Sequence, residues 1–231
     1  MRFEVTPGVA ALLPGAHFAT LTAHGLDTPV DRPAFDALLA GELARLPQAH
    51  PAYERAVATR QPPLLPYTTY FKRFKKTYPV LLQFESVLLK GRGIPPAGVP
   101  VEAMFLAELT HLLLGGGYDL DSTTGTLRVQ VTTGTETFQT MSGEPQTVAP
   151  GDLCLRDDTG LLGNVIYGPE YRTRITETSR NVMFIVYAVP GVPPAAARAQ
   201  LAALGSYLHT GLPDAELGPI QVWAADGTLL D

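Results

Sequence analysis

The sequence predicts an α+β domain, because segments with helical periodicity come first and segments with strand periodicity follow. Helical patterns dominate up to Gly117, and after Tyr118 short alternating or apolar runs are separated by glycine, proline and aspartate. No repeat of fixed period is found. With 231 residues, 45% of them hydrophobic, the chain can bury one substantial core, so we expect one main domain.

The N-terminal half is predicted to contain two strands and four helices. Residues 1–30 indicate a strand, a turn and an alternating strand. A helix is predicted over residues 32–46, with Asp31 as its N-cap and Pro33 in its first turn. The prolines of "QPPLLPY" then indicate a connection over residues 61–67.

An aromatic and basic segment follows this connection. In "TTYFKRFKKTY", residues 68–78, the aromatic residues Phe71, Phe74 and Tyr78 are spaced three and four apart, as on one helical face, with cations between them. Pro79 interrupts the pattern. Another helix is predicted over residues 81–89 with a stop at glycines 91 and 93.

The clearest predicted helix contains "VEAMFLAELTH" and stops at the glycine run 115–117. The following "DLDSTTG" predicts a tight turn into a strand. It does not fit an EF-hand loop, because Thr123 occupies the fifth position, which requires Asp or Asn, and Gln130 occupies the twelfth, which requires an acid. We predict no metal site and no cofactor, since His111 has no second histidine at ligand spacing and no phosphate-loop motif follows the glycines.

The C-terminal half is predicted to be rich in strands. Its strand-like runs cover residues 126–134, 136–141, 152–160, 161–168, 173–179 and 181–191. A helix is predicted over residues 193–212, and a hairpin turning at Asp226 and Gly227 follows it. Cys154, the only cysteine, is expected to occupy a strand position and fits a reducing compartment. With a poor secretory signal and no long apolar run, the sequence predicts a cytoplasmic protein.

The charge distribution is strongly uneven. The net charge is −5, but residues 60–92 hold seven basic residues against one acid, a net +6, and the remainder holds ten basic and 21 acidic residues, a net −11. This asymmetry predicts a polyanionic partner for the basic segment. The basic residues of the segment are Arg60, Lys72, Arg73, Lys75, Lys76, Lys90 and Arg92.

Two candidate sites remain open to two interpretations each. In residues 70–78, cations can neutralise phosphates while the aromatics stack on bases, or the aromatics are core residues and the cations a solvated face. In the strand-rich half, arginines, hydroxyls and carboxylates can bind an anion or an RNA end, or they serve ordinary turns and sheet edges. The second set includes Arg156, Asp157, Tyr167, Arg172 and Arg174.

Over residues 1–190, the order of segments resembles the B-three/B-four domain of the phenylalanyl-tRNA synthetase β subunit, as a free-standing bacterial protein. The resemblance is carried by residues 71–95 and 101–130, by "PGDLCLRD" and by "TRITETS", with Tyr118, Asp119 and Asp121 at an aromatic-Asp-x-Asp corner. It implies helices packed on a layered, mostly antiparallel sheet, as in the synthetase editing domain, and a pocket beside that corner. In the synthetase this domain hydrolyses tyrosine wrongly attached to tRNA.

The sequence departs from the family pattern at the positions that would orient a water or hold the ester. The family pattern of Val-Asp-x-Thr-Asn followed by a histidine is matched here by Val101, Glu102, Met104, Phe105 and Gly116, so the threonine, asparagine and histidine are absent. We therefore predict no catalytic residue.

The leading hypothesis is a stand-alone RNA-binding domain with tRNA as partner. Its predicted RNA-binding residues are Lys72, Arg73, Lys75, Lys76 and Arg92, and its predicted pocket residues are Tyr118, Asp119, Arg156, Asp157, Tyr167, Arg172 and Arg174. An aminoacyl-tRNA deacylase with a rebuilt pocket is the first alternative, and a small-molecule or protein-binding module the second. Residues 191–231 are predicted to form a helix and hairpin extension packed on the same domain.

Overall fold

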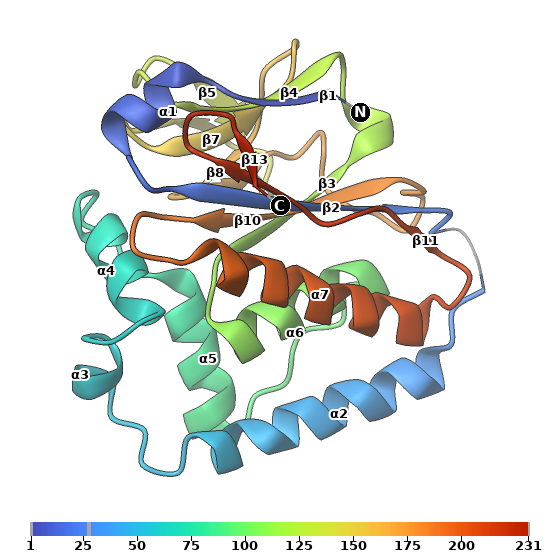
Figure 1. Ribbon diagram of the computed structural model, residues 1–231. Helices are drawn as coiled ribbons and strands as arrows, with labels where there is room; N and C mark the ends of the chain where they lie inside the picture. The colour runs from blue at the N-terminus through green and yellow to red at the C-terminus, as the bar shows by residue number, and fades with distance from the viewer. Residues whose placement is uncertain (1, 27–28, 231) are drawn as a thin grey trace.

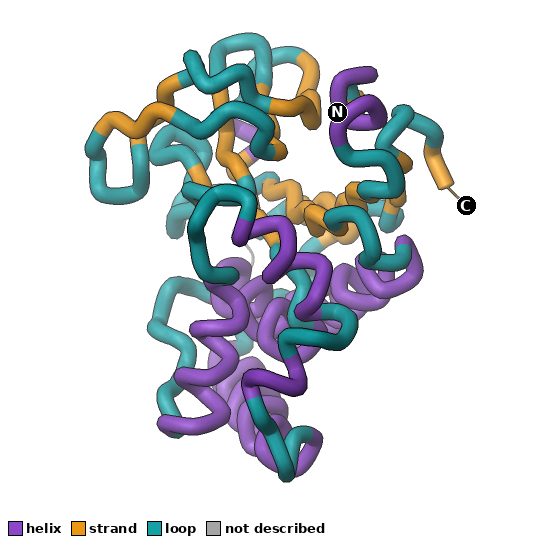
Figure 2. Tube along the Cα trace, turned by 90° about the vertical axis from the view of Figure 1, so that its left-hand side faces the viewer, coloured by secondary structure: helices purple, strands orange, loops and turns teal. Residues whose placement is uncertain are grey.

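The computed structural model describes residues 2–26 and 29–230 and has an α+β fold in three layers (Figure 1). An outer sheet lies on one face of a central sheet, and helices cover the other face. Figure 2 shows the same division, with strands gathered towards one end of the molecule and helices towards the other. The α+β class expected from the order of the segments is therefore confirmed.

The central sheet has the strand order β13-β12-β2-β10-β3, with β11 also paired to β2. All its pairings are antiparallel. Every residue of β10 is buried, because this strand lies inside the sheet with a layer on each face. The strands are β2 (His17–His24), β3 (Gly115–Asp119), β10 (Val182–Ala188), β11 (Glu216–Leu217), β12 (Gln221–Ala224) and β13 (Leu229–Leu230).

The outer sheet has the order β1-β4-β7-β8-β9. Its β1–β4 pair is parallel and its other pairs are antiparallel. A separate hairpin joins β5 to β6. The strands of this layer are β1 (Arg2–Val5), β4 (Thr126–Val131), β5 (Thr137–Gln139), β6 (Pro145–Thr147), β7 (Leu153–Arg156), β8 (Leu161–Asn164) and β9 (Gly168–Pro169).

The helical layer packs on the central sheet through α7, which contacts β2 and β10, while α6 and α2 pack against α7. Several helix ends form where the capping residues in the sequence predict them. The Asp31 carboxylate accepts a hydrogen bond from the Ala34 backbone N–H at 3.0 Å, and Gly91 ends α5 with a φ of 62°. The helices are α1 (Pro7–Leu12), α2 (Arg32–Ala49), α3 (Arg55–Ala58), α4 (Leu64–Lys72), α5 (Pro79–Lys90), α6 (Val99–His111) and α7 (Pro194–Gly211).

The aromatic and basic segment is not one continuous helical face, which corrects the expectation from its spacing. Helix α4 ends at Lys72, Lys75 has a left-handed backbone with a φ of 56°, and Pro79 starts α5. Proline disfavours helical backbone at the residue before it, so the helix cannot run on into α5. Phe71 and Tyr78 are nevertheless both buried, as expected of core aromatics.

The glycine run has a different role from the predicted helix stop. Helix α6 ends three residues earlier, where Leu112 adopts the left-handed conformation with a φ of 59°. Glycines 115–117 instead form most of β3, which pairs with residues 182–186 of β10. The turn predicted over "DLDSTTG" is present: the Asp119 carboxylate accepts from the Asp121 N–H at 2.9 Å, and β4 begins at Thr126.

Two other segments differ from the sequence predictions. Residues 7–12 form the short helix α1 where only a turn was expected. Residues 173–179, predicted to be a strand, form turns. There the Ser179 hydroxyl accepts from the Thr176 N–H at 3.0 Å and donates to Asp119 at 2.6 Å, so side chains satisfy groups that a sheet ladder would otherwise pair.

The C-terminal segment belongs to the central sheet and its helical cover. Strand β12 pairs with β2, and α7 buries Leu201, Leu204 and Leu208. The predicted hairpin is present, with Gly227 at a φ of 86° and the Ala224 N–H donating to the Thr228 carbonyl at 2.8 Å. In the described ranges, no helix combines the length and apolar character needed to cross a bilayer.

Candidate functional site

A cavity of about 300 Å³ lies where the helical layer meets the two sheets. Its walls come from the start of α5, from α6, from β3 and from the turn between β8 and β9. The side chains of Glu108, Tyr118, Asn164, Tyr167 and Tyr187 contribute polar groups to its lining. The rest of the wall is largely apolar side chains and glycine backbone, a composition typical of small-ligand pockets.

Glycines let β3 pass close to its neighbours at this cavity. A Cβ at Gly117 would lie 2.6 Å from Cδ1 of Ile175 and 3.2 Å from Sδ of Met104. A Cβ at Gly163, on β8, would lie 2.6 Å from the hydroxyl oxygen of Tyr118. Larger residues at either position would displace the cavity wall, which gives the glycine run a packing reason beyond turn formation.

Glu108 is an acid inside the apolar wall. Its carboxyl is 3% exposed and accepts a hydrogen bond from the Gly115 N–H at 2.7 Å. Burial raises its pKa to about 8, and the single backbone hydrogen bond opposes this only in part. Glu108 is therefore mostly protonated at neutral pH and can donate a hydrogen bond from its carboxyl.

Asn164 adds a second polar group to the wall. Its Oδ1 accepts from the Tyr167 N–H at 2.7 Å, which fixes the orientation of the amide. Its buried Nδ2 has no hydrogen-bond partner within the described part of the chain. Nearby, the hydroxyls of Tyr118 and Tyr187 bond to each other at 2.9 Å. The cavity thus suits an uncharged, largely apolar group that carries a hydrogen-bond acceptor.

Four of the five predicted RNA-binding cations share one short segment, and one of the four reaches a residue of the cavity wall. Lys72, Arg73, Lys75 and Lys76 occupy the end of α4 and the turn before α5, and all four are exposed. Among residues 2–26 and 29–230, no carboxylate forms an ion pair with them. The Lys76 ammonium lies 5.5 Å from the ring centroid of Tyr167, which lines the cavity. We call these four residues the cationic turn.

Arg92 is not part of the cationic turn. It follows α5, whose 12 residues place it about 18 Å from Lys76 along the helix axis. Arg92 is exposed, and its backbone N–H donates a hydrogen bond to the Ser86 carbonyl at 3.2 Å. The structure therefore groups four of the five predicted RNA-binding residues and separates the fifth.

Of the predicted pocket residues, Tyr118 and Tyr167 line the cavity, whereas buried Asp157 and half-buried Arg172 form an ion pair outside it. The Arg172 guanidinium donates to Asp157 at 3.1 and 3.2 Å. Burial alone would raise the pKa of Asp157, but hydrogen bonds from Thr159 and Arg172 outweigh it and hold that pKa at about 2. This ion pair joins the β7–β8 turn to the loop after β9.

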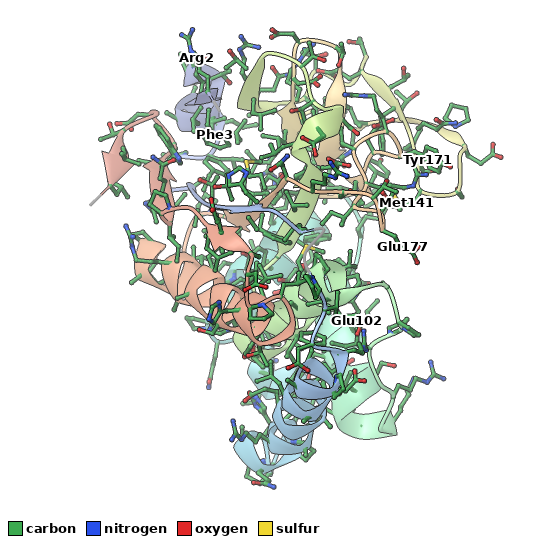
Figure 3. All side chains as sticks on the ribbon, turned by 90° about the vertical axis from the view of Figure 1, so that its right-hand side faces the viewer. Arg2, Phe3, Glu102, Met141, Tyr171 and Glu177 are labelled. Carbon is green, nitrogen blue, oxygen red and sulfur yellow. The ribbon has the colours of Figure 1, made fainter. Side chains whose placement is uncertain are left out.

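The other three predicted pocket residues also serve their own loops. Asp119 accepts from Asp121 and Ser179, and Arg156 donates to the Asp157 carbonyl at 3.3 Å. Arg174 lies 3.6 Å over the Tyr171 ring and donates to the Tyr171 carbonyl at 2.7 Å. Tyr171 itself lies in the sheet layers, distant from Glu102 in the helical layer (Figure 3). The turn-and-edge interpretation accounts for these contacts.

No protein-family model and no curated protein match this sequence. A solved structure with a similar fold is an N-terminal fragment of the phenylalanyl-tRNA synthetase β subunit from Pyrococcus horikoshii. It is 13% identical, with a TM-score of 0.46, over 95% of this chain and 55% of that chain. This chain thus spans about half the length of that fragment. A likeness at this distance shows no family membership.

The positions where the sequence departs from the synthetase pattern lie in the cavity wall. Met104, Phe105 and Gly116 all line it, so this part of the wall is apolar. Glu102, by contrast, is buried among the helices, where it accepts from Arg32 at 2.8 and 3.0 Å and from two backbone N–H groups (Figure 3). It holds α2 to the start of α6.

Sequence reasoning missed Glu108 and Asn164. Glu108 carried a usable signal, because it is an acid within the otherwise apolar run of residues 103–109, on a helix face that had to be buried. Asn164 carried none, since an asparagine before "VIYG" is equally typical of a turn. Cys154 is buried in β7, and burial raises its pKa to about 12, as befits a structural strand position.

Proposed function

We propose that this protein binds RNA through the cationic turn, and that tRNA is its partner. The observation that carries the proposal is the placement of four exposed cations, free of ion pairs with any described carboxylate, on one short turn of an otherwise acidic protein. Such unpaired cations break no ion pair when they bind, and they release counterions from the phosphate backbone. The sequence resemblance makes tRNA the first RNA to test.

The adjoining cavity supports an RNA end rather than a continuous duplex as the bound element. Lys76 is in contact with Tyr167 at the cavity, so a strand held by the cationic turn has its end within reach of a pocket for an uncharged group. Aromatic rings such as that of Tyr167 also provide stacking surfaces for unpaired bases.

Affinity for tRNA is expected to depend steeply on salt. With three to four phosphate contacts, the dissociation constant should rise about 18- to 150-fold between 50 and 200 mM salt. Replacing Lys72, Arg73, Lys75 and Lys76 together by glutamate should abolish binding in a fluorescence anisotropy titration. The control is Arg2→Glu with Arg45→Glu, which reverses two exposed arginines far from the turn in sequence and so makes half the change in net charge.

Thermal melting of each variant separates lost binding from lost folding. If Arg73→Glu destabilises the turn through its aromatic neighbours, the glutamine variants of the same four residues replace it. Absent binding of tRNA by the native protein, or binding that does not respond to salt, would overturn the proposal.

A second candidate function is hydrolysis of an ester whose uncharged group occupies the cavity, and Glu108 is the observation that favours it. A buried carboxyl with a pKa of about 8 keeps roughly a tenth of its molecules ionised at pH 7, and the ionised form can take a proton from water as that water attacks the ester carbonyl. The proton passes to Glu108 and then to the departing ribose oxygen, so the group is regenerated.

Mischarged tRNAs test this candidate. Ester loss above the rate in buffer should rise with pH, reach half its maximum near pH 8 and level off above it. Glu108→Gln should reduce it to the buffer rate while tRNA affinity stays unchanged. Glutamine keeps an acceptor for the Gly115 N–H, so the wall is preserved. If every ester survives as long as in buffer, the hydrolytic candidate is rejected and RNA binding alone remains.

A further inference from the structure

A second hollow lies on the other side of the cationic turn. It measures about 480 Å³ and lies between α3, α4 and the start of α5. Arg55, Lys72 and Lys76 line it, together with the hydroxyl residues Thr59, Thr68 and Thr77. No carboxylate lines this groove within the described residues. We call it the α3–α5 groove.

The cations of the groove are available to an anion. Lys72 and Lys76 have no carboxylate partner among the described residues, and Arg55 uses its Nε for a 3.5 Å ion pair with Glu85. Glu85 is itself held by the Tyr53 hydroxyl at 2.8 Å. This arrangement fixes the base of the Arg55 guanidinium and leaves its terminal nitrogens for another acceptor.

The other two residues of the cationic turn, Arg73 and Lys75, lie outside the groove. The Arg73 guanidinium lies 5.2 Å from the Tyr70 ring centroid and 5.4 Å from that of Phe74, and it reaches the Gly151 carbonyl at 3.5 Å. Gly151 precedes β7 of the outer sheet. Lys75 is at the tip, where its left-handed backbone reverses the chain. Neither residue lines the groove.

We propose that the α3–α5 groove is the seat of the RNA phosphates, with Arg55, Lys72 and Lys76 as its contacts and with Arg73 and Lys75 outside it. The inference rests on the proposed RNA binding and divides the cationic turn into two functional halves. The concave shape of the groove favours a single strand over a rigid duplex. Lys76 of the groove also contacts Tyr167, which lines the cavity.

Two double variants with the same change of charge test the division. Lys72→Gln with Lys76→Gln should lower the slope of log affinity against log salt by about 1.4 to 1.8, because each lost phosphate contact removes about 0.7 to 0.9. With the two lines meeting near 1 M salt, affinity at 100 mM should fall about 25- to 60-fold. Arg73→Gln with Lys75→Gln should leave the slope unchanged. Adding Arg55→Gln to the groove pair should lower the slope by about a further 0.7 to 0.9, the contribution of one phosphate contact.

A pair of RNA hairpins, one with an unpaired 3′ end and one blunt, provides the second readout. The native protein should prefer the unpaired end, and the groove variant should lose that preference. If the Arg73 and Lys75 variant carries the loss instead, or if the blunt hairpin binds equally well, the groove assignment is wrong while RNA binding stands. If the native protein binds neither hairpin nor tRNA at any salt concentration, the proposed function itself fails.

Discussion

At the scale of single residues, two buried carboxyls carry opposite protonation. Glu108 has one backbone hydrogen bond to offset its burial, so its pKa rises to about 8. Asp157 is also hidden from solvent but accepts from Thr124, Thr159, Gly160 and Arg172, and its pKa falls to about 2. The deeper burial of Glu108, and the donors around Asp157 that include the Arg172 cation, set the two charges, and the neutral carboxyl is at the cavity.

The protonation of Glu108 predicts a stability that falls with rising pH. Its unfolded pKa is about 4.5, so between pH 4.5 and 8 the folded state holds a proton that the unfolded state has released. Above pH 8 the cost should reach on the order of 5 kcal/mol. Glu108→Gln removes this contribution. In urea unfolding, the free energy of unfolding of the variant should therefore rise steadily relative to that of the native protein from pH 5 to 8.

Asp152 contributes a term of the same sign, because burial raises its pKa to about 7. The comparison of Glu108→Gln with the native protein cancels that contribution, since both proteins retain Asp152. A difference in unfolding free energy that is constant from pH 5 to 9 would contradict a proton on the buried Glu108.

At the scale of elements, local signals predicted most helices but not the ends that packing decides. The Asp31 cap and the Gly91 stop follow from short-range chemistry and were predictable. The stop of α6 at Leu112 was not, because Gly115 looked like the better cap. Tertiary pairing overrides that preference: residues 182–186 of β10 require a partner strand, and the glycines supply one that passes within reach of Ile175.

The cationic turn shows both what spacing predicts and where it fails. Spacing indicated that aromatics face inwards and cations outwards, and Phe71 and Tyr78 are buried while Lys72 and Lys76 are exposed. Spacing could not show that α4 ends at Lys72, and this break separates Arg73 from the groove lysines. The polar residues of the strand-rich half were harder still, because their partners lie far away in sequence, as Arg172 and Ser122 do.

At the scale of the whole molecule, the order of helices and strands predicted the class, but the three layers depend on long-range pairing that no local pattern contains. The parallel pair β1–β4 joins residues more than 120 positions apart, and β12 pairs with β2 across most of the chain. The cavity and the groove arise from these layers and from the break between α4 and α5. Candidate residues could be named from sequence, but which of them meet could not.

The C-terminal segment, residues 191–231, completes the central sheet and its helical cover, so its contribution to folding can be tested. The sequence divides the chain into residues 1–190 and an extension over residues 191–231, and that division stays a prediction. In the structure, the extension supplies β12 to the edge of β2 and covers the central sheet with α7. Removing it would expose the surface of the central sheet that Leu201, Leu204 and Leu208 cover. It would also leave β2 unpaired on one side.

We therefore expect residues 1–190 alone not to fold. Burial of three leucines is worth about 5 to 9 kcal/mol, comparable to the whole stability of a typical domain. A longer chain of residues 1–218, which keeps α7 and lacks only the β12–β13 hairpin, should fold with a lower melting temperature and self-associate through its open β2 edge. Circular dichroism melts and light scattering distinguish the two truncations. A cooperative, monomeric transition for residues 1–190 would instead identify them as an independent domain and the extension as dispensable for folding.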